Sequence, residues 1–405
     1  MKQEPPPTGT EGTSGRIFIV AGELSGDQHA AGMLGALLSG PEETRPSQVA
    51  GLGGSRMQAL CPEVEDWLEQ AAVLGLVEVL KKYGWFRDKM AETVTRILEG
   101  SFDGVVLVDY PGFNLRLAQR LRDKGYRGKL IYYISPQVWA WKRGRVKTMA
   151  RLLDGMICIF PFEKEFYDDS GLPTQFSGHP LVDALAPKRL PQGAREAGLV
   201  ALLPGSRERE IAALFPAMLD AASRLLKVDP TLRFAIAPAN ERLAAQMQAM
   251  AQEAGLGEVV RRHPAGVHDL MQRAIAGAVA SGTATLEAAF FGLPYCLVYR
   301  VAWLTYVVGR LVVHVKFLGI VNLLAGREVV RELLQKQCDG AHLAAELSRL
   351  LGDPVARNRL RQEFAEVVAS LGSGSAYQNA AAAVRQFLLP CDPSPSPDSP
   401  SPPSP

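Results

Sequence analysis

The chain has few cysteines, almost no excess charge and no long apolar run, and each shortage excludes a class of protein. Its five cysteines are scattered over 405 residues, with no Cys-x-x-Cys pair and no histidine at a metal-ligand spacing, so we expect reduced cysteines and no metal site. The chain carries 44 Lys and Arg against 42 Asp and Glu, a formal net charge of +2, which is too small to attract nucleic acid. No segment offers about twenty uninterrupted apolar residues, so we expect no transmembrane helix.

The two ends of the chain lack the apolar residues that a folded segment needs. Residues 1–15 are polar and rich in Pro, Gly and Thr, and residues 390–405 consist largely of Ser-Pro repeats. We expect both segments to be disordered. The first apolar run, Ile17 to Ala21, has the length of a strand rather than that of a signal peptide. We therefore expect a cytoplasmic protein.

Between these ends, short apolar runs alternate with amphipathic stretches of helical length. Strands and helices that alternate in this way form parallel sheets with helices on both faces. The alternation restarts after a Pro-rich bridge at 185–192. We predict an α/β fold with two doubly wound, Rossmann-like domains, residues 16–186 and 187–340, that face each other across a cleft. We expect C-terminal helices over 341–389 to pack back across the domain boundary. The expected strands include Arg16 to Ala21, Gly104 to Val108, Lys129 to Ile134, Gly155 to Phe160, Leu199 to Leu203, Leu232 to Ala237, Ile275 to Ala280 and Tyr295 to Tyr299.

The most informative stretch is Ser281 to Pro294, where a small polar turn joins a buried strand to a helix. A helix that begins on small residues leaves its first N–H groups open, and with the positive end of the helix dipole they form a phosphate site. Glu287 follows one turn later, where its carboxylate could accept hydrogen bonds from two ribose hydroxyls. An ordinary helix cap would use the same small residues. The residues expected to contact a nucleotide are Ser281, Gly282, Thr283, Ala284, Thr285 and Glu287.

Two turns in the first domain carry polar side chains at the carboxyl end of a strand, where ligands bind in sheets of this kind. The first is the glycine turn at residues 21–27. Its side chains Glu23, Ser25 and Asp27 are expected to point into the cleft, although Ser25 and Asp27 also fit as helix caps. The second carries Asp109, a lone carboxylate that leaves an apolar strand. An Asp in such a place usually has a chemical task.

Two basic residues in or near the second domain remain open to more than one interpretation. Arg207, in the turn after that domain's first strand, could neutralise a diphosphate or simply belong to a helix cap at the surface. His179 lies at the hinge between the domains. Its imidazole either contacts a phosphate or braces the hinge, and the sequence does not separate these roles.

One stretch of the first domain, Val73 to Arg87, is unusually apolar for a soluble core and includes Lys81, Lys82 and Arg87. Apolar residues beside cations are typical of a segment that lies in a membrane surface or holds acyl chains. Packing of one helix face on the first sheet is the alternative. The residues assigned to this membrane or acyl patch are Leu74, Leu76, Val77, Val79, Leu80, Trp85 and Phe86.

Taken together, these stretches resemble the lipid A disaccharide synthase family, which comprises inverting glycosyltransferases with the two-domain GT-B fold. The resemblance runs in order over roughly residues 16–388. Its most specific motifs are Ser-Pro-Gln-Val-Trp-Ala-Trp at 135–141 and Asn-Leu-Leu-Ala-Gly-Arg-Glu at 322–328. The other matching motifs are Ala21 to Asp27, Gly51 to Gly54, Val108 to Asn114, Gly178 to Leu181, Leu203 to Arg207 and Ser281 to Glu287.

The resemblance implies a reaction in which UDP-2,3-diacylglucosamine donates its sugar to the 6-hydroxyl of 2,3-diacylglucosamine 1-phosphate. The product is a β-1,6-linked disaccharide, and UDP is released. Inverting transfer needs a base on the acceptor side and charge stabilisation on the leaving diphosphate. Asp109 is assigned as the base, Arg207 and the N–H groups around 281–285 receive UDP, and Glu287 binds the ribose. No carboxylate pair for a divalent metal is visible, so these groups would do what Mg²⁺ does elsewhere.

The remaining expectations also follow from the resemblance. Glu23, Ser25, Gly26 and Asn322 are placed around the sugars. No cofactor is expected. Because both substrates carry acyl chains, we expect peripheral association with the cytoplasmic face of the inner membrane, and a homodimer formed through the C-terminal helices stays open.

Two rival functions also stay open. One is another UDP-sugar enzyme of the same fold, either a 2-epimerase or a transferase of peptidoglycan precursors. The motifs at 139–141 and at Asn322 argue against it. The other is a non-catalytic nucleotide-binding protein of the membrane surface, against which the presence of both Asp109 and Arg207 argues.

Overall fold

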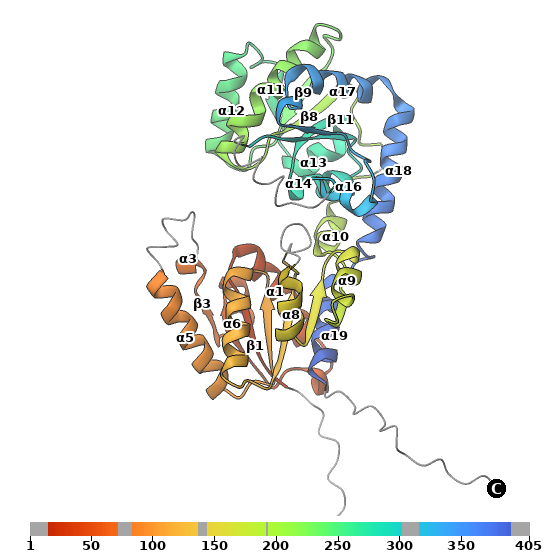
Figure 1. Cartoon of the computed structure of the whole chain (residues 1–405). Coiled ribbons are helices and arrows are strands. Elements are labelled where there is room, and N and C mark those ends of the chain that lie inside the picture. Colours follow the sequence, from red (N-terminus) through yellow and green to blue (C-terminus); the bar gives the residue numbers. More distant parts are fainter. Residues whose placement is uncertain (1–14, 72–82, 137–143, 192, 302–315, 390–405) are drawn as a thin grey trace, which may run out of the picture. The chain divides into compact units, whose positions relative to one another are not determined.

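The computed structural model describes residues 15–71, 83–136, 144–191, 193–301 and 316–389. These residues form two compact units. The first comprises the described residues up to Gly178 together with those from Ser375 onward, and the second runs from His179 to Gly374. Figure 1 shows one sheet flanked by helices in each unit. The two predicted doubly wound domains are therefore confirmed as α/β folds.

The first unit is built on a seven-stranded sheet in the order β3-β2-β1-β4-β5-β6-β7, and all of its pairings are parallel. Its strands are β1 (Arg16–Ala21), β2 (Gln48–Gly53), β3 (Val64–Asp66), β4 (Gly104–Val108), β5 (Lys129–Tyr133), β6 (Gly155–Cys158) and β7 (Thr174–Phe176). Its helices are α1 (Leu24–Leu38), η1 (Glu42–Thr44), α2 (Ser55–Leu60), α3 (Leu68–Ala71), α5 (Tyr83–Glu99), α6 (Pro111–Asp123), α8 (Gly144–Leu152), α9 (Pro161–Asp168) and α19 (Ala376–Leu388).

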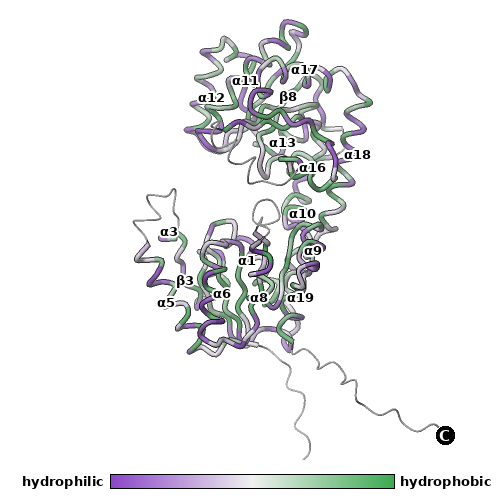
Figure 2. Tube along the Cα trace, in the orientation of Figure 1, coloured by the Kyte–Doolittle hydropathy of each residue, from purple (hydrophilic) through white to green (hydrophobic). Residues whose placement is uncertain are grey.

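The strands of this sheet are buried on both faces, as expected for parallel strands covered by helices. Along β1, Phe18 and Val20 join one hydrophobic core with residues of α5, α6 and α8, while Ile17 and Ile19 join another with residues of α1 and α19. Side chains alternate between the faces of a strand, so one apolar run serves both cores. Figure 2 shows the hydrophobic residues gathered along the strands.

The C-terminal helix α19 is an integral part of the first unit. It packs against α1, where the hydroxyl of Tyr377 lies 3.1 Å from Nδ1 of His29. Arg385 donates to the carbonyl oxygen of Leu37 at 3.0 Å, and Asn379 donates to that of Ser177 at 3.0 Å. The chain therefore returns to its first unit after completing the second.

The second unit contains a six-stranded parallel sheet in the order β10-β9-β8-β11-β12-β13. Its strands are β8 (Leu199–Leu203), β9 (Arg233–Ile236), β10 (Val260–Arg262), β11 (Ala276–Ala280), β12 (Tyr295–Tyr299) and β13 (Glu332–Leu334). Its helices are α10 (Pro180–Leu185), η2 (Ala186–Lys188), α11 (Glu208–Leu226), α12 (Glu241–Glu253), α13 (Gly266–Arg273), α14 (Thr283–Phe290), α16 (Ile320–Ala325), η3 (Gln335–Gln337), α17 (Gly340–Gly352) and α18 (Pro354–Ser370).

Both sheets contain one point at which the order of the strands reverses. In the first unit it lies between β1 and β4, and in the second between β8 and β11. The crevice at the carboxyl ends of such a strand pair is where open α/β sheets bind ligands. Each unit therefore has one position at which a ligand is expected to bind. Among the described residues, no helix combines the length and the hydropathy needed to cross a bilayer.

Candidate active site

The reversal point of the first unit holds a strained turn. Asp109 and Tyr110 follow β4 and both have φ of 47°, in the left-handed region that residues with a side chain rarely adopt. The carbonyl oxygen of Asp109 accepts hydrogen bonds from Asn114 Nδ2 at 2.7 Å and from the Tyr132 hydroxyl at 2.5 Å, while its N–H donates to Tyr133 at 2.9 Å. These contacts hold the strained backbone, so the direction in which the Asp109 side chain leaves the strand is fixed.

The carboxyl group of Asp109 has a raised pKa. Burial, followed by the neighbouring charge of Glu23, raises its pKa to about 6, and the backbone N–H of Tyr110 partly opposes this. The group is therefore mostly ionised at neutral pH, yet it still accepts a proton readily. A pKa near the working pH is what general-base catalysis requires.

The glycine turn after β1 places Glu23 beside this carboxylate. A Cβ on Gly22 would lie 2.1 Å from the ring of Tyr110, so only glycine lets that ring pack against the turn. Glu23 and Ser25 are exposed, and Glu23 immediately precedes α1 without capping it through its side chain. Both side chains are thus available to a ligand at the carboxyl end of β1.

Asp27 does not point into this site, and the expectation that it would is wrong. Its side chain is buried, and it accepts hydrogen bonds from the N–H groups of Gly54 at 2.7 Å and Met57 at 3.2 Å. These donors lie at the N-terminus of α2, whose unpaired N–H groups attract a carboxylate. Asp27 therefore ties α1 to α2 and β2.

The reversal point of the second unit presents open backbone donors. Gly282 has φ of 148° and precedes α14 without a side-chain cap. Thr285 is buried, and its N–H and hydroxyl both donate to the carbonyl oxygen of Gly282, at 3.1 and 2.7 Å. Thr285 thus closes the turn, and the N–H groups of Thr283 and Ala284 are left at the positive end of the helix.

Glu287 lies one turn further along α14 and has a partner that the sequence did not reveal. His268, on α13, brings its Nε2 to 3.4 Å from a carboxylate oxygen of Glu287, and both side chains are about three-quarters buried. On its other side, Nδ1 of His268 lies 3.4 Å from Nζ of Lys188. No fixed spacing links His268 to the nucleotide turn, so only the packing of α13 against α14 brings them together.

Arg207 lies at the end of the turn after β8, directly before α11. Its guanidinium is 81% exposed and pairs with Glu210 at 3.0 Å. Glu210 also accepts from the N–H of Ser206 at 3.1 Å. The arginine therefore belongs to the helix cap, which is one of the two roles that the sequence allowed. Its guanidinium is exposed, so it can still bind an anion.

Asn322 is fully occupied by its own loop. It is buried on α16, and its Nδ2 donates to Val330 and to Glu332, each at 2.8 Å. Its Oδ1 accepts from the N–H groups of Val329 and Val330, each at 2.8 Å. An asparagine amide has two donors and two acceptor positions, so all four are used. The side chain shapes the turn after α16 and has no hydrogen-bonding capacity left for a sugar.

His179 acts as a cap in the structure. It precedes α10, and its Nδ1 accepts from the N–H of Leu181 at 3.1 Å. Its own N–H donates to Leu371 at 2.8 Å. These contacts favour the bracing role at the start of the second unit.

The apolar patch is described only in part. Trp85 and Phe86 are half-buried at the start of α5, where the ring of Trp85 stacks on Trp67 with centroids 6.0 Å apart. The other predicted members lie outside the described residues; they are Leu74, Leu76, Val77, Val79 and Leu80. The tryptophans of the 135–141 motif also lie outside the described residues. Among the described residues, no group of three His, Cys, Asp or Glu side chains is arranged to hold a metal ion.

Comparison with known proteins identifies the family. The profile described as lipid-A-disaccharide synthetase matches residues 17–387. The lipid-A-disaccharide synthase of Geobacter sulfurreducens is 40% identical over 390 residues, which cover 94% of this chain and 99% of that protein. That of Persephonella marina is 34% identical and covers 92% and 99%.

Solved structures agree on the fold at much lower identity. A UDP-GlcNAc 2-epimerase from Neisseria meningitidis has a TM-score of 0.52 at 12% identity and covers 92% of this chain and 99% of its own. A calicheamicin glycosyltransferase has a TM-score of 0.53 at 15% identity and covers 92% and 98%. These likenesses concern the fold alone, which is GT-B. On the sequence match, the chain belongs to the lipid-A-disaccharide synthetase family and is a glycosyltransferase of lipid A biosynthesis.

Proposed function

We propose that the chain transfers the sugar of UDP-2,3-diacylglucosamine to the 6-hydroxyl of 2,3-diacylglucosamine 1-phosphate with inversion. Family membership supports the substrates. The observation that carries the mechanism is Asp109, a carboxylate whose pKa is raised to about 6 and whose backbone is held in a strained turn at a ligand-binding position.

In this mechanism Asp109 is the general base. As the 6-oxygen of the acceptor bonds to the anomeric carbon of the donor, its proton passes to the Asp109 carboxylate. The bond between that carbon and the UDP oxygen breaks, and the electron pair leaves with UDP. Glu23 beside Asp109 keeps the carboxylate basic by raising its pKa. A single displacement of this kind inverts the configuration without a covalent intermediate.

The second unit is the proposed site for UDP. The N–H groups of Thr283 and Ala284 and the dipole of α14 bind its phosphates, and Arg207 supplies a cation that stabilises the departing diphosphate. Glu287 accepts hydrogen bonds from the ribose hydroxyls, and His268 orients that carboxylate. Ser281 and Gly282 form the turn that lets the phosphate approach the backbone.

The sugars occupy the remaining polar positions of the proposed site. Glu23, Ser25 and the backbone at Gly26 are the proposed contacts of the acceptor. Asn322 acts indirectly, as a positioning residue that holds the turn after α16. Because both substrates are acylated, we also propose that the enzyme works at the cytoplasmic surface of the inner membrane, with the stretch Val73 to Arg87 against the lipid.

The decisive experiment uses the full chain and both purified lipid precursors. Release of UDP that requires both lipids, together with a disaccharide product, supports the proposal. No UDP release with both lipids present would overturn it. A 2-epimerase would instead interconvert its UDP-sugar in the absence of the acceptor lipid, so the same assay separates the rival enzyme.

A further inference from the structure

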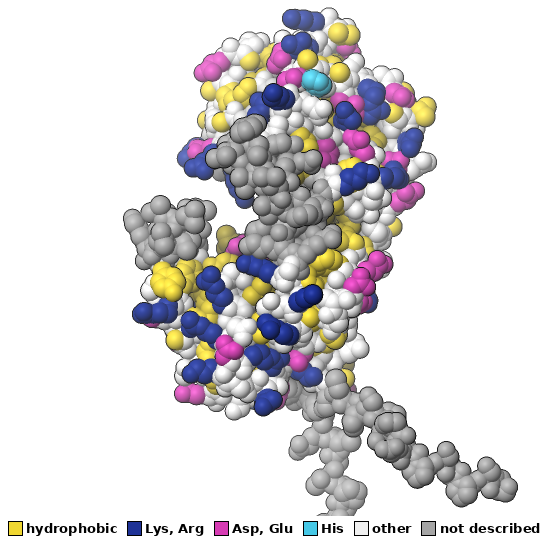
Figure 3. Space-filling model, viewed as in Figure 1, with side chains coloured by type: hydrophobic (Ala, Val, Ile, Leu, Met, Phe, Trp, Pro, Cys, Tyr) yellow, Lys and Arg dark blue, Asp and Glu magenta, His cyan; other side chains and the backbone are white. Residues whose placement is uncertain are grey.

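A cavity of about 430 Å³ lies in the first unit, between the first turns of α5 and the first half of α6. Its volume is within the range of roughly 300–1,000 Å³ that is typical of small-molecule pockets. Figure 3 shows a hydrophobic area on this unit with Lys and Arg side chains around it. The residues that line the cavity are Tyr83, Phe86, Arg87, Met90, Tyr110, Gly112, Phe113, Arg116 and Arg120.

This cavity, called the α5–α6 groove below, is lined mainly by apolar and aromatic side chains, and three arginines also line it. Arg116 and Arg120 are exposed and lie one turn apart on the same face of α6. Arg87 lies on α5 and pairs with Asp88 at 2.9 Å. Within the described parts of the chain, neither Arg116 nor Arg120 has an ion pair or a side-chain hydrogen bond. An apolar interior with two unneutralised cations matches an amphiphile whose head is anionic.

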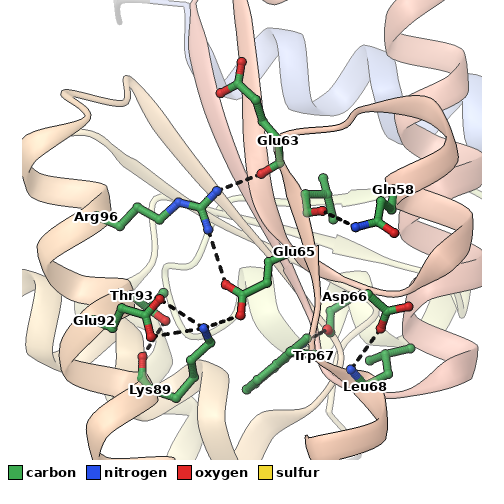
Figure 4. A network of polar contacts seen from close by, with 12 residues as sticks. Gln58, Glu63, Glu65, Asp66, Trp67, Leu68, Lys89, Glu92, Thr93 and Arg96 are labelled. Atoms are coloured by element: carbon green, nitrogen blue, oxygen red, sulfur yellow. Dashed lines mark hydrogen bonds and ion pairs between the residues drawn. The ribbon is translucent and has the colours of Figure 1, made fainter.

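The wall formed by α5 is held in place by an ion-pair network whose cation, Lys89, is buried and whose other members are partly exposed. Figure 4 shows Lys89, from α5, between the carboxylates of Glu65 and Glu92, with Arg96 reaching Glu65 as well. Nζ of Lys89 lies 2.5 Å from Glu65, and the lysine side chain is only 7% exposed. A buried cation that is paired in this way resists displacement, because breaking the pair leaves an uncompensated charge. The groove therefore has a fixed wall directly beside Met90.

The groove also lies next to the proposed catalytic base. Tyr110 lines it and is adjacent in sequence to Asp109. In the proposed acceptor, the phosphate is on C1 and one acyl chain is on C2, so these groups leave the sugar from neighbouring carbons. An apolar groove beside two cations can receive both at once.

We propose that the α5–α6 groove binds the acceptor substrate, with one acyl chain in its apolar interior and the anomeric phosphate on Arg116 and Arg120. This assignment rests on the proposed function for the identity of the acceptor. It predicts that the groove, rather than the nucleotide site, sets both the acyl-chain preference and the need for a phosphate.

Gly112 allows the acyl-chain part to be tested without disturbing the core. It is exposed at the start of α6, and a Cβ added there would meet nothing within 4 Å. Gly112→Leu extends a side chain into the groove, and Gly112→Ala is the matched control. Burial of one methylene contributes about 0.8 kcal/mol, or about fourfold in affinity. Excluding two or three methylenes should raise the ratio of the dissociation constants for long-chain and short-chain acceptor by about 10-fold or more in Gly112→Leu, and much less in Gly112→Ala.

The phosphate part has its own pair of variants. Arg116→Gln with Arg120→Gln should weaken binding of 2,3-diacylglucosamine 1-phosphate by about 10-fold, because charge-assisted hydrogen bonds to a phosphate are lost. The affinity of this double variant for the same lipid without its phosphate should not change. The control, Arg127→Gln with Arg151→Gln, removes the same charge from exposed positions of the same unit outside the groove and should not alter either affinity.

Binding is measured by titration calorimetry with the full chain and without donor, so the result does not depend on turnover. A wild-type chain that binds the acceptor but releases no UDP would contradict the proposed function and still test the groove. Equal losses for long and short chains, or for lipids with and without phosphate, would overturn the groove assignment. So would variants that lose binding to anionic vesicles while keeping wild-type acceptor affinity, since the groove would then be a bilayer-docking surface.

Discussion

The two units have the same strand order at their reversal points, yet the chemistry at these points differs. In the first, a carboxylate is half-buried, strained and shifted to a pKa of about 6. In the second, an exposed arginine precedes α11, and a glycine turn precedes the free N–H groups at the N-terminus of α14. Burial favours proton transfer, because it raises the proton affinity of a carboxylate. Open donors favour anion binding, because nothing has to be displaced before a phosphate arrives.

The difference also concerns stability. Strain and burial at Asp109 are held by contacts with Asn114, Tyr132 and Tyr133, so the first site depends on tertiary structure that opposes local preference. The second site is a turn between a strand and a helix that glycine adopts easily. This difference supports the proposed division, in which the first unit carries the chemistry and the second binds the nucleotide, and the following changes test it.

The largest effect is expected from Asp109→Asn. Loss of the base should reduce kcat by about 10²-fold or more, while the UDP dissociation constant measured by calorimetry should stay near that of the wild type. The folded carboxyl group has a pKa above its ordinary value, so it stabilises the fold at acidic pH and loses that contribution as the pH rises through about 6. At pH 8 the variant should therefore melt no lower than the wild type. Near-normal turnover would show that Asp109 is structural.

A smaller, mixed effect is expected from Arg207→Ala. A cation on the diphosphate acts in both the ground state and the transition state, so UDP affinity and kcat/KM should fall together, by about 10-fold. The matched control is Arg209→Ala, which lies two residues later in the first turn of α11 and is also exposed. A loss of turnover with unchanged UDP affinity would move Arg207 from nucleotide binding to chemistry and break the division between the units.

A third change distinguishes binding of the ribose from binding of the phosphates. Glu287→Gln should weaken UDP several-fold while leaving the affinity for inorganic phosphate unchanged, because the carboxylate is assigned to the ribose. His268→Ala should have a weaker effect in the same direction, since His268 acts through Glu287. Equal losses for UDP and phosphate would mean that Glu287 only supports α14.

The strands with uninterrupted apolar runs could be predicted to the residue. This holds for β1, β4, β8 and β12, because strands buried on both faces read as continuous apolar sequence. The strand β2 was not predicted, since its sequence contains Gly51 and Gly53, which are poor strand formers. A Cβ on Gly51 would meet the carbonyl oxygen of Ile19 at 2.1 Å, so the glycine reflects a tertiary approach that the sequence does not display.

The candidate site could be predicted where a single residue and its position along a strand indicate its chemistry. It could not be predicted where the chemistry depends on contacts with residues that are distant in the sequence. Asp109 could be selected because it leaves an apolar strand. Its raised pKa could not, because that depends on burial and on Glu23. Asp27 was recognised as a possible helix cap but not as a partner of the N-terminus of α2, and Asn322 was recognised as a motif residue but not as one that holds a loop. Motif spacing does not say which way a side chain points. Nothing in the sequence around His268 indicated that it lies beside Glu287.

The smallest change tests the link between the two carboxylates of the first unit. After burial, the charge of Glu23 is the next cause that raises the pKa of Asp109, so Glu23→Gln should lower that pKa towards its ordinary value. The rate rises as Asp109 loses its proton, so the acid limb of kcat/KM against pH, centred near pH 6 in the wild type, should move to lower pH. Glu43→Gln is the control, because Glu43 lies with Gly15 near the opposite end of β1. If both variants kept the wild-type acid limb, the charge of Glu23 would not contribute to the pKa of the base. A fall in acceptor affinity without a pH shift would instead leave Glu23 as a sugar contact that does not tune the base.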